Sequence, residues 1–458
     1  MKFEKFLILL LLVVVGIRLV TFNINTSFSW DEAVYFGLAE SLADGKEYGY
    51  IGNQNVEGFR PPLFPVMLAG LFYIFGASIT VAQIFVSTLF IVSLMVFYIT
   101  LKNVYNKRVS LLVTLFFVTN HLVIFFSNRI FAEMLALLLV VLSLYFFERM
   151  RKNVKFIIPF ATTLVLAFLT RFNLLVLLVI YLTYFLVFER TWLKKILMTQ
   201  YFFVGIVISL LIAYPYLDFV LKSKETIANS PQLKFEKFAF PTNYVLYFWL
   251  LPLFSTPFFV YGIYKFYKSK AKSVLEKFSV IFIIIFLIAN GLILSSFRYL
   301  IPILPFIAIL TFAFFKNKSK MVLSLVIILF LLNLTTGYTV TYFFINPPQD
   351  FKQLPSPIEI RAYFAESLDR KNAALYLKNL TSESEIVMSN AHAWVWLYTH
   401  RDWVPIGSNE QEYLDNVKKY DIKYIYSDGP LPVFVEKASD VEKVWSGYAD
   451  VYRIDFVS

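Results

Sequence analysis

Two adjacent carboxylates, Asp31 and Glu32, follow the first apolar run of this chain. Because hydrophobic residues make up 59% of the sequence, a pair of acidic side chains beside an apolar segment requires an explanation. A carboxylate at such a place can accept a proton from a hydroxyl group. The sequence therefore predicts Asp31, with Glu32 beside it, as candidate catalytic residues at a membrane surface.

The same stretch also has a structural interpretation. Ser29 and Glu32 have the spacing of a capping box. In this motif each side chain accepts a hydrogen bond from the backbone N–H of the other residue at the start of a helix. Asp31, in the first turn of that helix, would complement the helix dipole. Glu32 is therefore a helix cap or a catalytic group. Asp31 lies at the edge of an apolar stripe that includes Leu38, where a carboxylate needs a polar partner.

Arginines at several predicted helix ends complement these carboxylates. A guanidinium can bind a phosphate through two parallel hydrogen bonds. Each arginine could also be an ordinary anchor at the membrane interface. Carboxylates and arginines together indicate transfer from a phosphate-bearing donor to an alcohol at the outer surface. The candidate phosphate-binding residues are Arg60, Arg171, Arg298 and Tyr299.

Other polar residues near the same predicted face complete the set. Tyr35, Glu57 and His121 could line a cavity for the acceptor, although His121 also suits a structural role. Arg129 and Glu133 have the i,i+4 spacing of one predicted helix, which favours an ion pair within that helix.

The composition indicates a polytopic α-helical membrane protein. The chain has 458 residues, of which 19% are aromatic, and its mean hydropathy is +0.66. It contains no cysteine, which excludes disulfides, thiol nucleophiles and cysteine metal sites. A net charge of +11 could suggest nucleic acid as a partner. The lysines and arginines instead lie mostly in short loops between apolar runs, as the positive-inside rule requires, so the expected partner is a lipid bilayer and not a nucleic acid.

The recurring basic loops predict about eleven membrane-spanning helices, with the N-terminus inside and the C-terminus outside. This topology places loop 23–79, loop 215–240 and everything after 346 on the outer side of the plasma membrane. The approximate spans are 5–22, 80–101, 109–127, 130–148, 156–171, 173–189, 196–214, 241–264, 277–295, 299–315 and 321–345.

Loop 23–79 is expected to carry two interfacial helices. The helix that begins near Ser29 ends near Gly45 and would lie along the membrane surface through the stripe that includes Val34 and Leu38. The run Leu63–Phe75 is apolar all round but too short to span, and the prolines before it suit a first helical turn. This loop belongs, in our interpretation, to a transmembrane domain of residues 1–345.

Residues 346–458 are expected to form a small extracytoplasmic α/β domain. A proline-rich linker opens the segment. Helical and strand patterns then alternate, and a second capping box, Ser408 with Gln411, is expected to open a helix that runs to Lys419.

Four short motifs occur in order: Trp30-Asp31-Glu32-Ala33, Phe59-Arg60-Pro61-Pro62-Leu63-Phe64-Pro65, Leu169-Thr170-Arg171-Phe172-Asn173 and Phe297-Arg298-Tyr299-Leu300-Ile301-Pro302. With the topology, this set resembles the GT-C superfamily of membrane glycosyltransferases, in the branch of protein O-mannosyltransferases and the aminoarabinose transferase of lipid A. The resemblance covers residues 1 to about 345, and the C-terminal segment is similar to the small domain of many relatives.

The resemblance implies a polyprenyl-phosphate-linked sugar donor, a hydroxyl-bearing acceptor and transfer outside the cytoplasm with inversion at the anomeric carbon. Asp31 would be the base, Arg60 would approach the donor phosphate, and Arg298 is a second candidate for that contact. Some relatives carry an acidic residue before the basic-Pro-Pro element, close to a metal. Here Phe59 holds that position and Glu57 is the nearest carboxylate, so a divalent metal ion stays an open question and no other cofactor is expected.

The alternative function is a polytopic transporter or flippase of lipid-linked sugars. Transporters usually show repeated halves with broken helices near the bilayer midplane. This sequence shows no internal repeat, and its polar residues gather at one predicted face. We therefore favour a membrane glycosyltransferase.

Overall fold

The structure is a computed structural model that describes residues 28–55, 60–222, 256–269, 272–291, 297–312, 358–438 and 440–455, with single positions at 5, 8, 12, 16, 328 and 331. Glu57, Phe59 and the proline-rich linker lie outside the described residues, as do nearly all of the predicted spans 5–22 and 321–345 and most of the predicted span 241–264.

The described residues belong to two compact units. The first, which we call the bundle unit, comprises residues within 1–23, 61–64 and 83–342. The second, which we call the mixed unit, comprises residues within 24–60, 65–82 and 343–458. Residues of the predicted outer loop therefore group with the C-terminal segment, although the sequence analysis placed that loop with the transmembrane domain.

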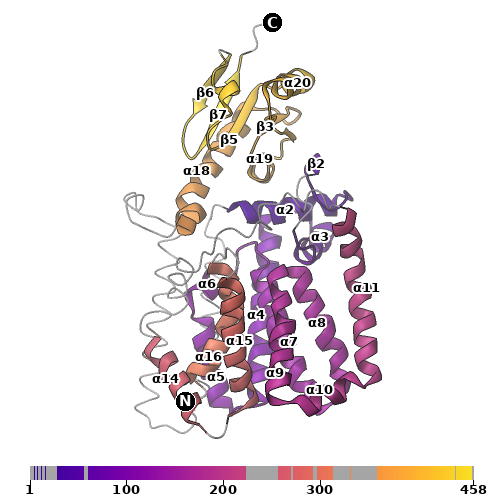
Figure 1. The fold of residues 1–458 in the computed structure, drawn as a ribbon. Helices are drawn as coiled ribbons and strands as arrows, with labels where there is room; N and C mark the ends of the chain where they lie inside the picture. The colour runs from indigo at the N-terminus through magenta and orange to yellow at the C-terminus, as the bar shows by residue number, and fades with distance from the viewer. Residues whose placement is uncertain are drawn as a thin grey trace. The chain divides into compact units, whose positions relative to one another are not determined.

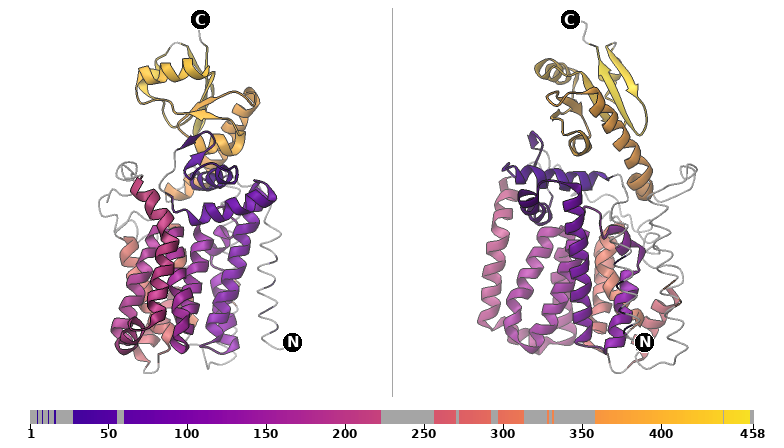
Figure 2. Two further views of the ribbon diagram at one scale, coloured as in Figure 1. Left: turned by 90° about the vertical axis from the view of Figure 1, so that its right-hand side faces the viewer. Right: turned by 180° about the vertical axis from the view of Figure 1, so that it is seen from behind.

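The bundle unit is built from apolar helices that run side by side (Figures 1 and 2). α7 packs against α8, α8 against α11, and α15 against α9 and α16. The helices and 3-10 helices are α4 (Ile79–Lys102), α5 (Lys107–Val118), α6 (His121–Phe126), α7 (Glu133–Lys152), η2 (Val154–Phe156), α8 (Ile157–Thr170), η3 (Phe172–Leu175), α9 (Val176–Phe188), α10 (Arg190–Leu197), α11 (Gln200–Lys222), α14 (Thr256–Lys268), α15 (Val274–Gly291), η6 (Phe297–Ile303) and α16 (Leu304–Phe312).

Length and composition single out one helix in the described part, Ile79–Lys102, that could cross a membrane by itself. Arg190–Leu197 and Gln200–Tyr216 meet the same requirement together, with a bend of 72° between them. Shorter apolar helices include Val154–Thr170 and Phe172–Phe188. The total of about eleven spans stays a prediction.

Two predicted spans are interrupted by local chemistry. The expected helix 109–127 breaks at Asn120, whose side chain accepts a hydrogen bond from the Leu122 N–H at 3.0 Å and so caps α6. The expected helix 299–315 begins as η6, which contains Pro302. Proline has no N–H for an α-helical hydrogen bond, and the regular helix α16 starts only at Leu304.

The mixed unit contains a five-stranded sheet in the order β4-β3-β5-β7-β6 (Figure 1). β3 pairs in parallel with β4 and β5, whereas β7 pairs antiparallel with β5 and β6. The C-terminal elements are α18 (Ile358–Leu380), β3 (Val387–Ser389), α19 (His392–Thr399), β4 (Trp403–Val404), α20 (Glu410–Tyr420), β5 (Tyr424–Asp428), α21 (Val433–Glu436), β6 (Val441–Trp445) and β7 (Ala449–Ile454).

The predicted cap of the helix near Ser408 is wrong by one residue. Asn409 is the N-cap of α20, and its side chain accepts a hydrogen bond from the Glu412 N–H at 2.9 Å. Glu412 in turn accepts from the Ser408 N–H at 2.7 Å. Both Ser and Asn can cap a helix, so the pattern alone did not decide between the neighbouring positions.

The remaining elements of the mixed unit come from the predicted outer loop: α2 (Trp30–Ala43), β1 (Tyr50–Ile51), β2 (Gln54–Asn55) and most of α3 (Leu63–Phe75). α2 contacts both α19 and β1. It is buried from Glu32 to Ala39, which is more than the single stripe expected for a helix lying on a membrane surface. The β1–β2 turn lies close to α19 at Gly52, where a Cβ would be 2.6 Å from the Trp396 ring.

Candidate active site

Asp31 and Arg60 form an ion pair within the mixed unit. Asp31 Oδ1 lies 2.6 Å from Arg60 Nη2, and the side chains are 14% and 13% exposed. The first turn of α2 carries the carboxylate, while the Tyr48 hydroxyl donates to the Arg60 carbonyl at 2.6 Å and fixes the backbone of the arginine. The ion pair fixes the orientation of the Asp31 carboxylate at the start of α2.

Glu32 forms the capping box expected from the sequence. Its Oε2 accepts hydrogen bonds from the Ser29 N–H at 2.9 Å and from the Ser29 hydroxyl at 3.1 Å. The residue is fully buried. A carboxylate engaged in this way holds the start of α2 in place, so that Asp31 projects from a fixed helical turn.

The three acceptor-site candidates have different outcomes. Tyr35 is 5% exposed and belongs to the packed core around α2. Glu57 lies outside the described residues, and so does the side chain of His121, whose backbone opens α6. Their role in binding an acceptor stays a prediction.

A second cluster of charges lies in the bundle unit, around Glu133. Its Oε1 is 2.5 Å from Arg171 Nη1 and 3.5 Å from Arg298 Nε. The three side chains are 2%, 11% and 8% exposed, in that order. The structure thus brings Arg171 and Arg298, from chain segments far apart in the sequence, onto one buried carboxylate.

Aromatic rings hold these guanidinium groups in place. The Arg171 guanidinium lies 4.1 Å from the centre of the Tyr299 ring. That of Arg298 lies 5.1 Å from the same ring and 4.9 Å from the ring of Phe131. Arg298 Nη2 also approaches the Tyr299 hydroxyl at 3.4 Å. A cation over the face of an aromatic ring is attracted to that face, so the two rings hold both guanidinium groups beside Glu133.

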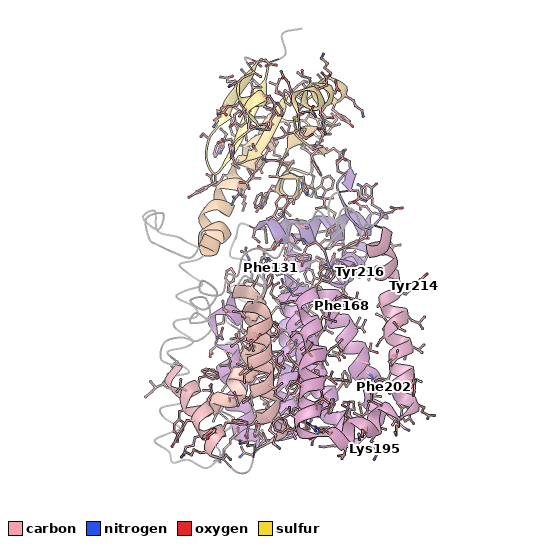
Figure 3. The ribbon with its side chains drawn as sticks, viewed as in Figure 1. Phe131, Phe168, Lys195, Phe202, Tyr214 and Tyr216 are labelled. Atoms are coloured by element: carbon pink, nitrogen blue, oxygen red, sulfur yellow. The ribbon has the colours of Figure 1, made fainter. Side chains whose placement is uncertain are left out.

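The local backbone explains how each arginine reaches the cluster. Arg171 ends α8 in an extended conformation, so its side chain leaves the helix axis before η3 begins. Arg298 lies in η6, which adjoins α7. Figure 3 shows Phe131 at the end of the bundle opposite Lys195, so the Arg298 contact with Phe131 is made at that end.

The prediction that Arg129 and Glu133 share one helix is wrong. Arg129 was expected to pair with Glu133 along one helix, but α7 begins at Glu133 and Arg129 lies in the preceding turn, so the helical spacing does not apply. The signal that could have identified Glu133 is its buried position beside two helix ends that carry arginine, which is visible only in three dimensions.

The cluster is suited to binding an anion. Arg171, Arg298 and Glu133 together carry a net charge of +1 in a buried environment, where a phosphate would be strongly attracted. A metal site is not supported by the described residues, since no group of three or more His, Asp or Glu side chains there could hold an ion.

Comparison with known proteins supplies independent information on this architecture. Residues 59–219 match the family model for dolichyl-phosphate-mannose-protein mannosyltransferase. The structure is similar to ArnT from Cupriavidus metallidurans bound to undecaprenyl phosphate, with a TM-score of 0.72 and 12% identity over 100% of this chain and 99% of that chain. The resemblance to the GT-C superfamily is confirmed.

A more distant structure has the same GT-C architecture. The archaeal oligosaccharyltransferase AglB from Archaeoglobus fulgidus, in complex with an inhibitory peptide and a dolichol-phosphate, gives a TM-score of 0.56 at 13% identity. The match covers 93% of this chain and 70% of that one. No curated protein matches the sequence. At these identities the structural matches show the GT-C fold, and the family model covers Arg60, Glu133 and Arg171 directly.

Proposed function

We propose that this protein is an inverting glycosyltransferase that moves a sugar from a polyprenyl-phosphate donor to a hydroxyl acceptor. The reaction would take place on the extracytoplasmic face of the plasma membrane. Residues 1–345 would supply the transmembrane part, and residues 346–458 an extracytoplasmic α/β domain. The observation that carries the proposal is the cluster of Arg171 and Arg298 around the buried Glu133.

The arginine cluster would bind the donor phosphate. In the reaction the bond between the anomeric carbon and the phosphate oxygen breaks, and the polyprenyl phosphate gains negative charge as it leaves. Cations aimed at the departing oxygen stabilise the transition state more than the ground state, which is what accelerates the step. Tyr299, which lies against both arginines, would keep them in the geometry that the phosphate needs.

Asp31 would act as the general base. It would take the proton of the acceptor hydroxyl while the oxygen forms the new bond to the anomeric carbon from the side opposite the leaving phosphate, which inverts the configuration. Arg60 orients this carboxylate. Since a guanidinium has five N–H donors, Arg60 can hold Asp31 and contact a phosphate at the same time.

Three similarities support the donor class. The family model describes enzymes that use dolichyl-phosphate mannose, and two structures of the same fold hold undecaprenyl phosphate or dolichol-phosphate. These lipids share a phosphate on a polyprenyl chain. A protein acceptor, a lipid or a glycan would each offer the hydroxyl that the base requires.

The test is reconstitution of the purified protein in liposomes with a panel of polyprenyl-phosphate sugars and hydroxyl acceptors. We expect sugar transfer, release of polyprenyl phosphate in equal amount, and an inverted anomeric centre by NMR. Movement of the intact lipid-linked sugar across the bilayer, with no transfer, would replace the proposal with a flippase.

A matched pair of variants tests the phosphate site. Arg298→Gln should weaken donor binding at least about tenfold, because a charge-assisted contact to phosphate is lost. Arg151→Gln is the control, since Arg151 pairs with Glu189 at 2.7 Å and is given no part in phosphate binding. Equal donor affinities in the two variants would remove Arg298 from the site.

A further inference from the structure

Two side chains of α19 form hydrogen bonds with the Phe28 backbone, one with its carbonyl and the other with its N–H. The Trp394 Nε1–H donates to the Phe28 carbonyl at 3.0 Å, and the Phe28 N–H donates to the Tyr398 hydroxyl at 2.9 Å. All three residues are buried. Trp394 and Tyr398 lie one turn apart on α19, so a single face of this short helix makes both bonds.

Contacts between aromatic rings connect the same helix to Trp30, the first residue of α2. The Trp30 ring lies edge-on to Trp394 at 5.1 Å and to His392 at 4.9 Å between centroids. His392 in turn stacks on Trp403 at 4.4 Å. Edge-to-face and stacked rings have defined geometries, so they fix direction as well as position.

The far end of α2 is held by the same part of the C-terminal segment. The Trp396 Nε1–H donates to the Glu40 carboxylate. Nearby, the Trp403 Nε1–H donates to the Ile51 carbonyl at 3.1 Å, which secures the β1–β2 hairpin. Because α2 is held at both ends, it cannot rotate or slide without breaking indole hydrogen bonds.

Phe28 immediately precedes Ser29, the N-cap of the helix turn that carries Asp31. On the basis of the proposed function, we propose that Trp394 and Tyr398 are positioning residues for sugar transfer. By holding the N–H and the carbonyl of Phe28, they fix the direction of the first turn of α2. That direction determines how the Asp31 carboxylate meets the acceptor hydroxyl. The C-terminal segment is then part of the transfer machinery, and not only an appended domain.

The variants are Trp394→Phe and Tyr398→Phe, which keep an aromatic ring and remove one hydrogen bond each. Tyr413→Phe is the matched control. Tyr413 is 3% exposed in the core of the same unit, and its hydroxyl makes no hydrogen bond in the described part of the chain. All three full-length variants would be compared with the wild type in liposomes.

The first readout is whether each substitution changes kcat, the donor KM or both. Displacement of a reacting group by about 1 Å can cost about 100-fold in rate. We therefore expect kcat to fall about tenfold or more in Trp394→Phe and Tyr398→Phe, with the donor KM within about twofold of wild type, and no change in Tyr413→Phe. A purely structural role would lower the amount of folded protein and leave kcat per folded molecule unchanged, which would overturn the proposal.

The second readout does not depend on activity. Hydrogen–deuterium exchange of the backbone from Ser29 to Ala33 should speed up in Trp394→Phe and Tyr398→Phe, and stay at the wild-type rate in Tyr413→Phe. Unchanged exchange in the first two variants would overturn the positioning role. If the wild type transfers no sugar but the exchange result is as expected, the proposed function is wrong. The conclusion that Trp394 and Tyr398 hold the start of α2 in place then remains valid.

Discussion

The Asp31 carboxylate and the Arg60 guanidinium lie 2.6 Å apart, on opposite sides of the β1–β2 hairpin in the sequence. The sequence predicts different tasks for the two residues: Asp31 would act on the acceptor, and Arg60 would contact the donor phosphate. Their pairing means that a change at either residue alters the orientation of the other. The consequences of Arg60 substitutions therefore include effects on the base.

Substitution of Arg60 should affect turnover in proportion to the charge and geometry that are lost. Arg60→Gln removes the guanidinium that pairs with Asp31, and we expect kcat to fall about 100-fold, within the range found for a misplaced catalytic group. Arg60→Lys keeps the charge but not the planar fork, and should retain more activity. Steady-state kinetics with a saturating donor measures both. Wild-type turnover in Arg60→Gln would show that the ion pair has no part in catalysis.

Neutralising Glu133 should destabilise the ligand-free protein and increase the rise in Tm that a phosphate ligand causes. Glu133→Gln removes the carboxylate that Arg171 and Arg298 share, and removal of one partner of a buried ion pair costs about 3–5 kcal/mol. A bound phosphate replaces the lost negative charge. We therefore expect a lower Tm without ligand, and a larger rise in Tm on addition of polyprenyl phosphate than the wild type shows.

Glu148→Gln is the control for this comparison, since Glu148 is a buried glutamate on the same helix, 3.9 Å from Arg151. Its ligand-induced rise in Tm should equal that of the wild type. If Glu133→Gln gains no more from polyprenyl phosphate than Glu148→Gln does, the cluster around Glu133 does not bind the phosphate.

The half-buried ring of His392 predicts a loss of stability in acid. Burial lowers the pKa of His392 to about 4, and its Nε2 makes no hydrogen bond in the described part of the chain. Between about pH 6.5 and pH 4 the unfolded chain binds a proton at this residue that the folded protein does not, so the free energy of unfolding decreases as the pH falls through this window. The loss is roughly 2–3 kcal/mol by pH 4.

The comparison is with His392→Phe, which keeps a ring between Trp30 and Trp403 but cannot be protonated. Thermal unfolding at pH 7 and at pH 4.5 should show a smaller decrease in Tm for the variant than for the wild type. Equal decreases would mean that His392 is not the group responsible.

Local sequence signals predicted local structure. The capping box at Ser29 and Glu32 is present, and the apolar run Leu63–Phe75 forms a helix with those bounds. Each feature depends on residues a few positions apart, whose interactions the chain enforces directly. The same kind of signal failed where two neighbouring residues could do the same task, as Ser408 and Asn409 could at the start of α20.

Long-range partners could not be predicted. Nothing near Glu133 in the sequence identifies Arg171 and Arg298 as its partners, because the packing of α7, α8 and η6 brings them together. The packing of α2 against α19 likewise depends on indole hydrogen bonds between residues more than 350 positions apart, such as the bond from Trp394 to Phe28. A spacing pattern carries no information about pairs of this kind.

Asp31→Asn tests most directly whether Asp31 accepts the proton of the acceptor hydroxyl. The variant keeps the shape of the side chain and removes the base. In liposomes with a saturating polyprenyl-phosphate sugar, we expect turnover reduced about 100- to 10,000-fold, as for loss of a general base. Turnover close to that of the wild type would contradict this role.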